Sequence, residues 1–493
     1  MKLEELLKGI EVIKIEGRSD ISVTSLIYDS RKASPGAVFV CLKGAKSDGH
    51  IYASDVASKG ASVIIAEDEI NVDTEKTTVV YVKDSRLALA LSSANFFGHP
   101  LDKLTLIGIT GTKGKTTTAH MVKSIIESAG FGCGMVGTMG AFIGDEKIPT
   151  RNTTPESYEL QYLFNEMVKK GCKYAVIEAS SQAFKLRRTA GITFDYAAFL
   201  NISPDHIGEG EHKDFEDYLE CKSMMFGQTK ETIVNIDADR WQDAIRRAGG
   251  NYHSISVKEK ASLYADNIKM LWSDDMLGIS FDVHGDMEGS FKLGIPGEFN
   301  VENALVAMEI THLMGISDEA IRQGLRTVYV KGRTQLLHCA LPITTMIIDY
   351  AHNALSMEQL LTTLRSYEPK RLICLFGGGG NKPKQRRYDM GAMSAKYADL
   401  TILTMDNPRF EEIDDINKDI LVGVNEFGGK YEIINDRKEA IRYLLDNAKK
   451  DDMIALIGKG HEEYQEVKGE RFHFSEQEVV EEYMEEYMKE HKA

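Results

Sequence analysis

The chain has 493 residues, of which 43% are hydrophobic and 27% charged, so it is long enough for about three domains with buried cores. Its formal net charge of -16 argues against nucleic acid or an anionic membrane as a partner, because either would require a basic surface. It contains no run of 18 apolar residues and no charged-then-apolar start, so we expect a cytoplasmic protein that neither spans a membrane nor is exported.

The first section of the chain extends to about residue 100 and contains short apolar runs separated by turn residues. Such runs are typical of strands, and an apolar helical pattern precedes the His99-Pro100 break. We expect a small N-terminal α/β domain over residues 1–100. Its strands are predicted at residues 25–28, 37–42, 62–66 and 77–82, and its helix at residues 85–97.

A glycine-rich segment, Gly108-Ile-Thr-Gly-Thr-Lys-Gly-Lys-Thr-Thr-Thr118, follows the apolar run 104–109 and precedes a helical pattern at 117–129. This order of strand, loop and helix is the context in which backbone N–H groups bind phosphates. Lys115 supplies a positive charge there, and the Thr116 hydroxyl is a ligand for Mg²⁺. We therefore expect the segment to bind ATP. The predicted ATP-binding loop residues are Gly111, Thr112, Lys113, Gly114, Lys115, Thr116 and Thr117.

Apolar runs then alternate with helical patterns, which predicts a mainly parallel sheet with helices on both faces in a central domain, residues 101–332. Ligands of such sheets bind at the carboxyl ends of the strands. Glu178 ends one strand and is placed either to hold Mg²⁺ or to face water. His206 follows another strand and is either a metal or phosphate contact or a structural histidine. The strands are predicted at residues 174–178, 196–201 and 232–235, and a helix at 303–314.

Lys222 and two asparagines leave alternatives open. With an ordinary pKa of about 10.4, a lysine is a cation that cannot bind Mg²⁺, and only a carbamylated lysine could. The residues around Lys222 by themselves favour an ordinary lysine. Asn300 and Asn303 lie one turn apart and either cap the following helix or recognise the edge of an adenine base.

The third section, residues 333–493, contains apolar runs that are followed by glycine or polar loops. This pattern predicts a second, Rossmann-like doubly wound sheet. A charged helix at 476–492 closes the chain, and we assign no chemistry to it. The strands are predicted at residues 346–349, 371–376, 400–404 and 453–457, and a helix at 356–367.

Four polar loops follow the strands of this third section and are expected to form one rim. Arg409 suits a carboxylate and Glu462 an ammonium group, so the rim predicts a small zwitterionic substrate. The loops are Asp349-Tyr-Ala-His352-Asn, Gly377-Gly-Gly-Gly-Asn-Lys382, Asp406-Asn-Pro-Arg409 and Gly458-Lys-Gly-His-Glu462.

The six cysteines are scattered mostly among apolar neighbours, and none belongs to a CxxC pair. We expect reduced, buried thiols and neither a disulfide framework nor a zinc site. They are Cys41, Cys133, Cys172, Cys221, Cys339 and Cys374.

Taken together, these motifs resemble the Mur ligase family, the ATP-dependent amide-forming enzymes of peptidoglycan precursor synthesis. The family match is carried by Gly111-Thr-Lys-Gly-Lys-Thr116, Glu178-Ala-Ser-Ser181, Asn300-Val-Glu-Asn303, Gly332-Arg333 and Asp349-Tyr-Ala-His352. Further motifs narrow it to the branch that adds the third residue. These are Asp29-Ser-Arg31, Pro35-Gly36, Phe39-Val-Cys-Leu-Lys-Gly44, Asp48-Gly49-His50, Asn152-Thr-Thr-Pro155, Asp406-Asn-Pro-Arg409 and Gly458-Lys-Gly-His-Glu462.

The resemblance implies three domains, acting as a monomer, for a UDP substrate, for ATP with Mg²⁺, and for an incoming amino acid. It implies that a diamino acid, with meso-2,6-diaminopimelate favoured, is joined through an acyl phosphate to the D-glutamate of UDP-N-acetylmuramoyl-L-alanyl-D-glutamate. The implied catalytic residues are Lys115, His352 and a carbamylated Lys222, and the implied metal ligands are Thr116, Glu178, His206 and Lys222. The implied nucleoside contacts are Asn300, Asn303 and Arg333. The implied substrate contacts are Ser30, Thr153, Thr154, Ser180, Arg188, Lys382, Asp406, Asn407, Pro408, Arg409, Gly458 and Glu462.

Some residues depart from the family pattern and keep other functions open. Lys382 stands where diaminopimelate-adding members have arginine, and a lysine there is typical of a lysine-adding branch. Arg409 favours diaminopimelate instead, because its guanidinium can pair with the second carboxylate of that amino acid. Gln182, Gln335 and Ala354-Leu355 also differ from the usual residues. The alternatives are ligation of L-lysine or another diamino acid, a ligase resembling folylpolyglutamate synthase, and a non-catalytic nucleotide-binding regulator.

Overall fold

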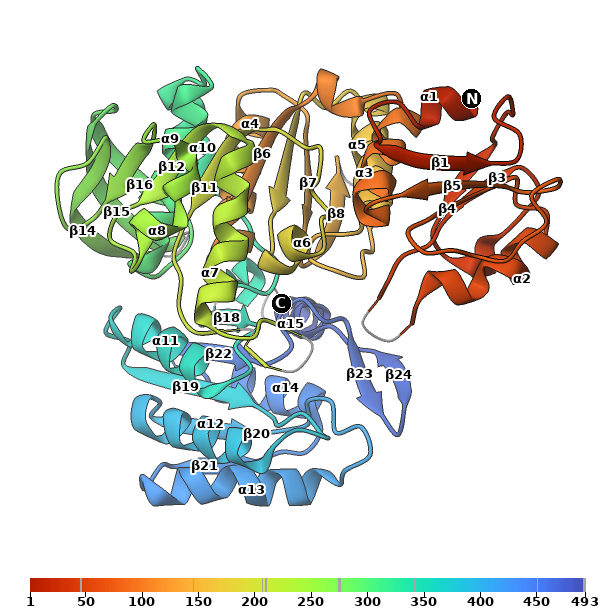
Figure 1. Cartoon of the computed structure of the whole chain (residues 1–493). Helices are drawn as coiled ribbons and strands as arrows, with labels where there is room; N and C mark the ends of the chain where they lie inside the picture. Colours follow the sequence, from red (N-terminus) through yellow and green to blue (C-terminus); the bar gives the residue numbers. More distant parts are fainter. Residues whose placement is uncertain are drawn as a thin grey trace. The chain divides into compact units, whose positions relative to one another are not determined.

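A computed structural model describes residues 1–44, 47–144, 146–205, 207–208, 211–273, 276–340, 343–449 and 451–490. The chain divides into two compact units, which are described separately. The first contains Met1–Tyr264, Gly285–Met287 and Leu305–Gly324, and the second contains Ala265–His284, Glu288–Ala304 and Leu325–Ala493. Figure 1 shows that each unit combines strands with covering helices, as expected of an α/β protein. Within the described residues, no helix is long and apolar enough to cross a membrane.

The N-terminal part of the first unit is a five-stranded sheet with the order β1-β5-β4-β3-β2, in which only β1 runs antiparallel to its neighbour. Strands β3 and β4 are buried along their whole length, which explains their continuous apolar sequence. The predicted strands and helix are confirmed to within two residues at each end. The elements are α1 (Leu3–Leu6), β1 (Val12–Glu16), β2 (Ser25–Ile27), η1 (Ser30–Lys32), β3 (Ala37–Val40), η2 (Gly49–Tyr52), α2 (Ala53–Ser58), β4 (Val63–Ala66), β5 (Thr78–Val82), α3 (Ser85–Phe96) and η3 (Pro100–Lys103).

The larger sheet of the first unit contains the strand order β13-β12-β11-β6-β10-β7-β8-β9, in which all neighbouring pairs are parallel except β7–β8 and β8–β9. This confirms the predicted mainly parallel sheet. The helix after the glycine loop begins at Lys115, two residues earlier than predicted, because Gly114 adopts a φ of 86° and ends the loop there. The elements are β6 (Thr105–Thr110), α4 (Lys115–Ser128), β7 (Cys133–Gly137), β8 (Gly140–Ile143), β9 (Glu146–Ile148), α5 (Ser157–Lys169), β10 (Tyr174–Glu178), α6 (Ser181–Lys185), β11 (Phe194–Phe199), α7 (Phe215–Ser223), η4 (Met224–Gln228), β12 (Thr229–Asn235), α8 (Trp241–Ala244), η5 (Arg246–Ala248) and β13 (His253–Ser256).

Three strands and two helices connect this sheet to the last third of the chain. Strand β14 starts beside β13, and β15 pairs antiparallel with β16; the sequence analysis did not predict these strands. The helix predicted at 303–314 begins four residues earlier, so Asn300 and Asn303 lie inside its first turns and do not precede it. The elements are β14 (Leu263–Ser273), β15 (Met276–Gly285), β16 (Gly289–Leu293), α9 (Phe299–Leu313) and α10 (Asp318–Thr327).

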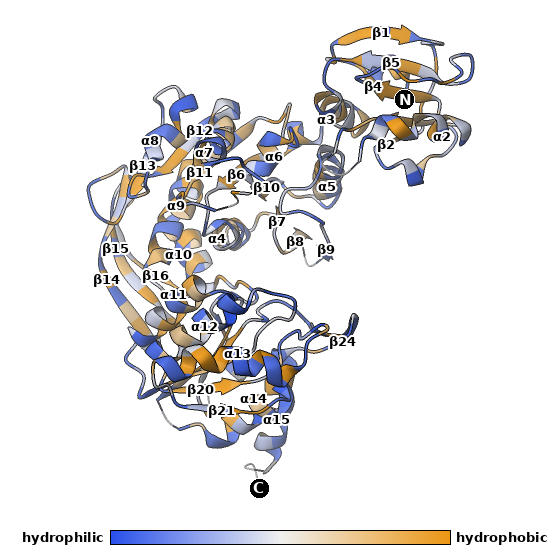
Figure 2. Cartoon of the chain, turned by 60° about the horizontal axis from the view of Figure 1, so that its bottom comes forward, coloured by the Kyte–Doolittle hydropathy of each residue, from blue (hydrophilic) through white to orange (hydrophobic). Residues whose placement is uncertain are grey.

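The second unit contains a six-stranded sheet, β17-β18-β22-β19-β20-β21, that is parallel except for β17. Alternate residues of its strands pack against α11, α12 and α13 on one face and against α14 and α15 on the other, which confirms the doubly wound sheet. Figure 2 shows the apolar colouring of β20 within this sheet. The elements are β17 (Gln335–Leu336), η6 (His338–Ala340), β18 (Thr345–Asp349), α11 (Ala354–Arg365), β19 (Arg371–Phe376), α12 (Lys384–Tyr397), β20 (Leu400–Leu403), α13 (Ile413–Glu426), β21 (Tyr431–Ile433), α14 (Arg437–Asn447), β22 (Asp452–Ile457), β23 (Tyr464–Val467), β24 (Glu470–His473) and α15 (Glu476–Glu490).

The structure accounts for two further expectations. The charged C-terminal helix α15 has an apolar side, since Val479, Val480 and Met484 belong to the core of the second unit. The described cysteine side chains are buried and form no disulfide, as predicted. They are Cys41, Cys133, Cys172, Cys221 and Cys374.

Candidate functional site

The glycine loop lies between the carboxyl end of β6 and the start of α4. Lys115 folds back over it, and its Nζ donates to the carbonyl oxygens of Gly111 at 2.7 Å and Thr112 at 3.0 Å. Asn201, at the end of the neighbouring strand β11, holds the loop: its Oδ1 accepts from Lys113 N at 2.9 Å, and its Nδ2 donates to Lys113 O at 3.1 Å. The loop is therefore built to present backbone N–H groups and one ammonium to an anion.

The Glu178 carboxylate lies beside the start of the same helix. Glu178 is 1% exposed, and both its oxygens accept from Thr116 Oγ1 at 3.0 Å. Thr138 donates to it from its backbone N at 3.0 Å and from Oγ1 at 3.1 Å. Gly137 leaves the space for this carboxylate, because a Cβ there would lie 2.1 Å from Glu178 Oε1. A carboxylate beside a threonine hydroxyl and a phosphate-binding loop is a donor set that fits Mg²⁺.

Lys222 is not the ordinary lysine that its neighbours in sequence indicate. It is 1% exposed on α7, and its Nζ donates to Gly111 O at 2.9 Å, the carbonyl that Lys115 also contacts. Its Nζ also lies 4.6 Å from the centre of the Tyr218 ring. Burial, and after it the charge of Lys115, hold the pKa of the Lys222 amine well below its ordinary value. A buried amine with a lowered pKa is a nucleophile, which is what reaction with CO₂ requires. His206 lies outside the described residues.

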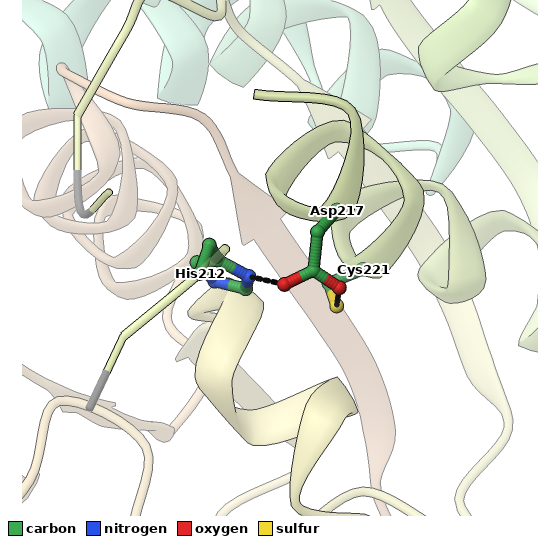
Figure 3. Close-up of side chains that lie close together, drawn as sticks. All are labelled: His212, Asp217 and Cys221. Atoms are coloured by element: carbon green, nitrogen blue, oxygen red, sulfur yellow. Dashed lines mark hydrogen bonds and ion pairs between the residues drawn. The ribbon is translucent and has the colours of Figure 1, made fainter. Parts of the chain in front are cut away.

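His212 was not predicted as a site residue, and Figure 3 shows its ring beside Asp217 and Cys221 of α7. His212 is fully buried, and its Nδ1 lies 3.1 Å from Asp217 Oδ2, while its Nε2 lies 2.8 Å from Ser181 Oγ. Asp217 also accepts from Lys185 Nζ at 2.8 Å. The hydrogen bond from Lys185, and after it that from His212, lowers the pKa of Asp217 to about 2, while burial opposes this shift. Cys221 Sγ lies 3.9 Å from the other oxygen of Asp217. The network fixes the helix of Lys222 against the start of α6.

The residues predicted to contact the muramoyl dipeptide gather beside Glu178. Thr154 is fully buried, and its Oγ1 donates to Glu178 O at 2.7 Å and accepts from Ser180 N at 3.0 Å. Arg188 donates from Nε to Glu156 Oε1 at 2.9 Å and from Nη1 to Thr154 O at 3.0 Å. Thr153 Oγ1 lies 3.2 Å from Thr138 Oγ1. These residues therefore share one network with Glu178.

A cavity of about 340 Å³ lies next to this network within the first unit. Ser30 is half-buried at the start of η1, where Asp29 caps the turn and pairs with Arg31 at 2.6 Å. Ser30 itself does not line the cavity, whereas Asp29 does. Other lining residues include Tyr28, Lys32, Arg151, Asn152, Glu156 and Glu159.

In the second unit, the four predicted loops meet around a cavity of about 190 Å³. They converge because β18, β22, β19 and β20 are neighbouring parallel strands whose carboxyl ends meet at one edge. Pro408 does not line the cavity; its carbonyl oxygen lies 1.8 Å from where a Cβ on Gly380 would be, so only glycine fits there. The predicted residues that line the cavity are His352, Lys382, Asp406, Asn407, Arg409, Gly458 and Glu462.

Lys459 contacts Asp406 and Asn407, two residues that line this cavity, and was not predicted as a site residue. It is fully buried, and its Nζ donates to Asn407 Oδ1 at 2.9 Å and to Tyr464 O at 2.7 Å, and lies 3.2 Å from Asp406 Oδ1. Asn407 Nδ2 in turn donates to Glu462 Oε2 at 2.9 Å. Burial raises the pKa of the Glu462 carboxyl, and Lys459 opposes that rise. The cavity thus combines an anionic side with the cationic side formed by Arg409.

The three residues predicted to contact the nucleoside also lie in the second unit. Asn300 and Asn303 are buried, and Asn303 Nδ2 donates to Asn300 Oδ1 at 3.0 Å, while Asn300 Nδ2 donates to Pro296 O at 2.7 Å. Arg333 lies over the Tyr350 ring at 5.1 Å, and Tyr350 lines the cavity described above.

Three family models together match most of the chain. The Mur ligase middle domain matches residues 109–311, the Mur ligase glutamate ligase domain residues 332–460, and the Mur ligase family catalytic domain residues 22–96. A relative in Caldanaerobacter subterraneus, a UDP-N-acetylmuramoyl-L-alanyl-D-glutamate--2,6-diaminopimelate ligase, is 40% identical over 98% of this chain and 99% of its own length. The chain belongs to the Mur ligase family. A Clostridium perfringens ligase of the same name is 39% identical over 97% of the chain and 99% of its own length.

Solved structures of Mur ligases have the same fold. A UDP-N-acetylmuramoyl-L-alanyl-D-glutamate--2,6-diaminopimelate ligase structure superimposes with a TM-score of 0.75 at 26% identity over 99% of both chains. MurF from Acinetobacter baumannii gives a TM-score of 0.62 at 22% identity over 98% of both chains. The expected three-domain α/β architecture of the family is confirmed.

Proposed function

We propose that this Mur ligase joins meso-2,6-diaminopimelate to the D-glutamate of UDP-N-acetylmuramoyl-L-alanyl-D-glutamate at the expense of ATP. The observation that carries the proposal is the full-length similarity to ligases of that name. The cavity in the second unit supports it, because an amino acid with two carboxylates and two ammonium groups needs both of its charged sides. We further propose domains at residues 1–100, 101–332 and 333–493 for the UDP substrate, ATP and the amino acid.

In the proposed reaction the γ-carboxylate of the D-glutamate attacks the γ-phosphate of ATP, giving an acyl phosphate and ADP. The amino group of the incoming amino acid then attacks the carbonyl carbon, and inorganic phosphate leaves. No side chain acts as a nucleophile, so positioning and electrostatic stabilisation supply the rate. Lys115 offsets charge on the transferred phosphoryl group, and the glycine loop holds the phosphates.

Thr116, Glu178, His206 and a carbamylated Lys222 would hold Mg²⁺, which neutralises phosphate charge when it is bound. The structural support for carbamylation is the burial of Lys222, which favours the neutral amine that adds to CO₂. The carbamate would place an anion beside the Lys115 ammonium, where Lys222 otherwise has a neutral amine. We assign catalytic roles to Lys115, Lys222 and His352, with His352 orienting the substrate from the rim of the cavity.

The remaining residues bind substrate in this proposal. The muramoyl dipeptide contacts Thr153, Thr154, Ser180 and Arg188, and the uridine diphosphate contacts Ser30. Asn300, Asn303 and Arg333 contact the nucleoside of ATP. The incoming amino acid is bound by Lys382, Asp406, Asn407, Pro408, Arg409, Gly458 and Glu462.

We also propose that the chain acts in the cytoplasm, because ATP and UDP-linked precursors are made inside the cell, and that it acts as a monomer.

A competition assay tests the proposal. The chain is given UDP-N-acetylmuramoyl-L-alanyl-D-glutamate, ATP and Mg²⁺ with equal amounts of meso-2,6-diaminopimelate, L-lysine and L-ornithine, and the products are separated by mass. We expect the diaminopimelate product to dominate and Lys115→Met to abolish all products. Dominance of the lysine product would assign the specificity to Lys382. Phosphate release that does not depend on both substrates would contradict a ligase. In a second reaction folate replaces the UDP-linked dipeptide, and its preferred use would indicate a ligase resembling folylpolyglutamate synthase.

A further inference from the structure

Glu309 is a buried carboxylate for which the ligase reaction has no use. It lies on α9 in the first unit and is fully buried, and no described residue forms a hydrogen bond with either of its oxygens. Burial, and after it the charge of Asp286, raise the pKa of Glu309 to about 8. A carboxylate removed from water without a hydrogen bond is costly, so its retention needs an explanation.

Two other metal-binding side chains face Glu309. His253 Nδ1 lies 3.1 Å from Glu309 Oε1, and one ligand atom from each of His253, Asp286 and Glu309 lies within 4.8 Å of the other two. The three come from different segments, namely the start of β13, the turn after β15 and the middle of α9. Tertiary structure therefore brings them together, which distinguishes them from a run of acidic residues on one surface helix.

The backbone holds Asp286 in place. Asp286 N donates to Ser262 O at 2.8 Å, which ties the turn to the segment before β14. The preceding Gly285 has a φ of 105°, and a Cβ there would lie 2.1 Å from Ser262 O, so the turn approaches that segment as closely as glycine allows.

The two nitrogens of the His253 ring face different carboxylates. Nδ1 lies 3.1 Å from Glu309 Oε1, and Nε2 lies 3.6 Å from Glu231 Oε2. A metal ion bound between Nδ1 and Glu309 would leave the ring proton on Nε2, on the side of the Glu231 carboxylate. Nδ1 is therefore the ligand atom of the site.

The group lies three strands away from the phosphate loop across the sheet. His253 begins β13, and β12 and β11 lie between β13 and β6, the strand that leads into the loop. The site is therefore separate from the Mg²⁺ site around Glu178.

In the other two groups of histidine and acidic side chains among the described residues, both ring nitrogens of the histidine already form hydrogen bonds within the protein. His50 uses Nδ1 on Asp48 and accepts at Nε2 from Glu67 N at 3.0 Å and from Asp68 N at 3.3 Å. His212 uses both its ring nitrogens as well, as described above. The oxygens of Glu309, in contrast, have no such bonds.

We propose that His253, Asp286 and Glu309 bind a divalent transition-metal ion of the Zn²⁺ class, which ties β13, the β15–β16 turn and α9 together. One imidazole nitrogen and two carboxylate oxygens match the ligand preference of such ions, with water completing the coordination. The ion neutralises two carboxylates that otherwise lie side by side. The proposal concerns a structural site and does not depend on which amino acid the ligase uses.

The test uses the full chain, treated with chelator and kept in excess Mg²⁺ so that the nucleotide site does not bind the probe. Zn²⁺ binding is followed by calorimetry, and Co²⁺ binding by its visible absorption. We expect one Zn²⁺ per chain, a higher Tm in the presence of Zn²⁺, and loss of both in Glu309→Gln and His253→Gln. Glu231→Gln should weaken binding by about 10- to 100-fold, because it acts through the ring.

Glu288→Gln is the matched control. His284 also lies between two carboxylates, with Nδ1 3.1 Å from Glu288 and Nε2 3.2 Å from Asp266, but they face opposite ring nitrogens and cannot share an ion. Zn²⁺ binding should be unchanged in this variant. The proposal is overturned if the unmodified chain binds no Zn²⁺, or if Glu309→Gln and His253→Gln bind it as the unmodified chain does. Partly exposed His253 keeps the test valid should the buried Glu309 variant fail to fold.

Discussion

Replacing Arg409 with alanine should change which amino acid the ligase prefers. Arg409 follows β20, and its backbone N donates to Glu466 O at 3.0 Å. Its guanidinium lines the cavity of the second unit, where Nη1 donates to Gly380 O at 2.6 Å and Nε lies 3.8 Å from Glu466 Oε1. The Arg409 side chain is therefore held at the edge of the cavity by the hydrogen bond from Nη1 to Gly380 O, and its contact with the Glu466 carboxylate is long.

The size of the effect follows from the chemistry of the two amino acids. Diaminopimelate carries one more carboxylate than lysine, and a hydrogen bond to a charged group contributes about 1.5–3 kcal/mol. A guanidinium often forms two such bonds to a carboxylate, but Glu466 already neutralises part of its charge. We therefore expect a loss of about 2–4 kcal/mol, which corresponds to about 30- to 700-fold in kcat/KM.

The assay measures kcat/KM for meso-2,6-diaminopimelate and for L-lysine with the same UDP-linked dipeptide. Arg409→Ala should lower the first value by that factor and leave the second nearly unchanged. Arg471→Ala is the control, because Arg471 lies at the same 3.8 Å from Glu466 and over Tyr464 at 4.3 Å but does not line the cavity. An unchanged ratio of the two values in Arg409→Ala would refute the reasoning.

Three further predictions follow from buried or paired charges. Lys222→Met should reduce phosphate release at least about 100-fold and remove the stimulation by bicarbonate that we expect of the unmodified chain; stimulation that persists would exclude a carbamate on this residue. Arg437→Met leaves Glu476, its buried partner at 2.7 Å, without a counter-charge and should lower the free energy of unfolding in urea by about 3–5 kcal/mol, whereas adding Glu476→Leu should restore most of it. A double variant as unstable as the single one would contradict this. Arg387 lowers the pKa of Glu411 from 4.5 to about 2, so Glu411 stabilises the fold above its ordinary pKa and this contribution is lost as the pH falls towards 2. The Tm difference between Glu411→Gln and the unmodified chain should therefore be largest near neutral pH and shrink in acid; a constant difference would argue against the ion pair.

Much of the fold was predictable because neighbouring residues determine it. Continuous apolar runs such as β3 and β4 are buried on both sides, and the pattern states this directly. The ends of α4 and α9 were less accurate, since turn geometry at Gly114 and side-chain bonds around Asn300 determine where those helices start. The antiparallel strands β15 and β16 were missed, because short alternating segments between sheets carry a weak signal.

The chemistry of the site depended on the structure to different degrees. Thr116 and Glu178 follow predicted strands, so the rule for parallel sheets placed them together before their 3.0 Å contact was seen. Lys459 lies inside the predicted loop Gly458-Lys-Gly-His-Glu462 but was given no role there, and His212 was not singled out, because the neighbouring residues do not indicate that either side chain is buried. Both are fully buried and bond to residues distant in sequence, such as Asn407 and Ser181.

By itself, the sequence determined most of the strands and helices, the glycine loop, the four-loop rim and the resemblance to the Mur ligases, since these depend on residues close together in the chain. Only the tertiary structure determined which ionisable side chains are buried away from solvent. Lys222 became a buried amine with a lowered pKa, and Glu309 came to face His253. Desolvation depends on everything packed around a group, and most of those atoms belong to segments far away in the chain.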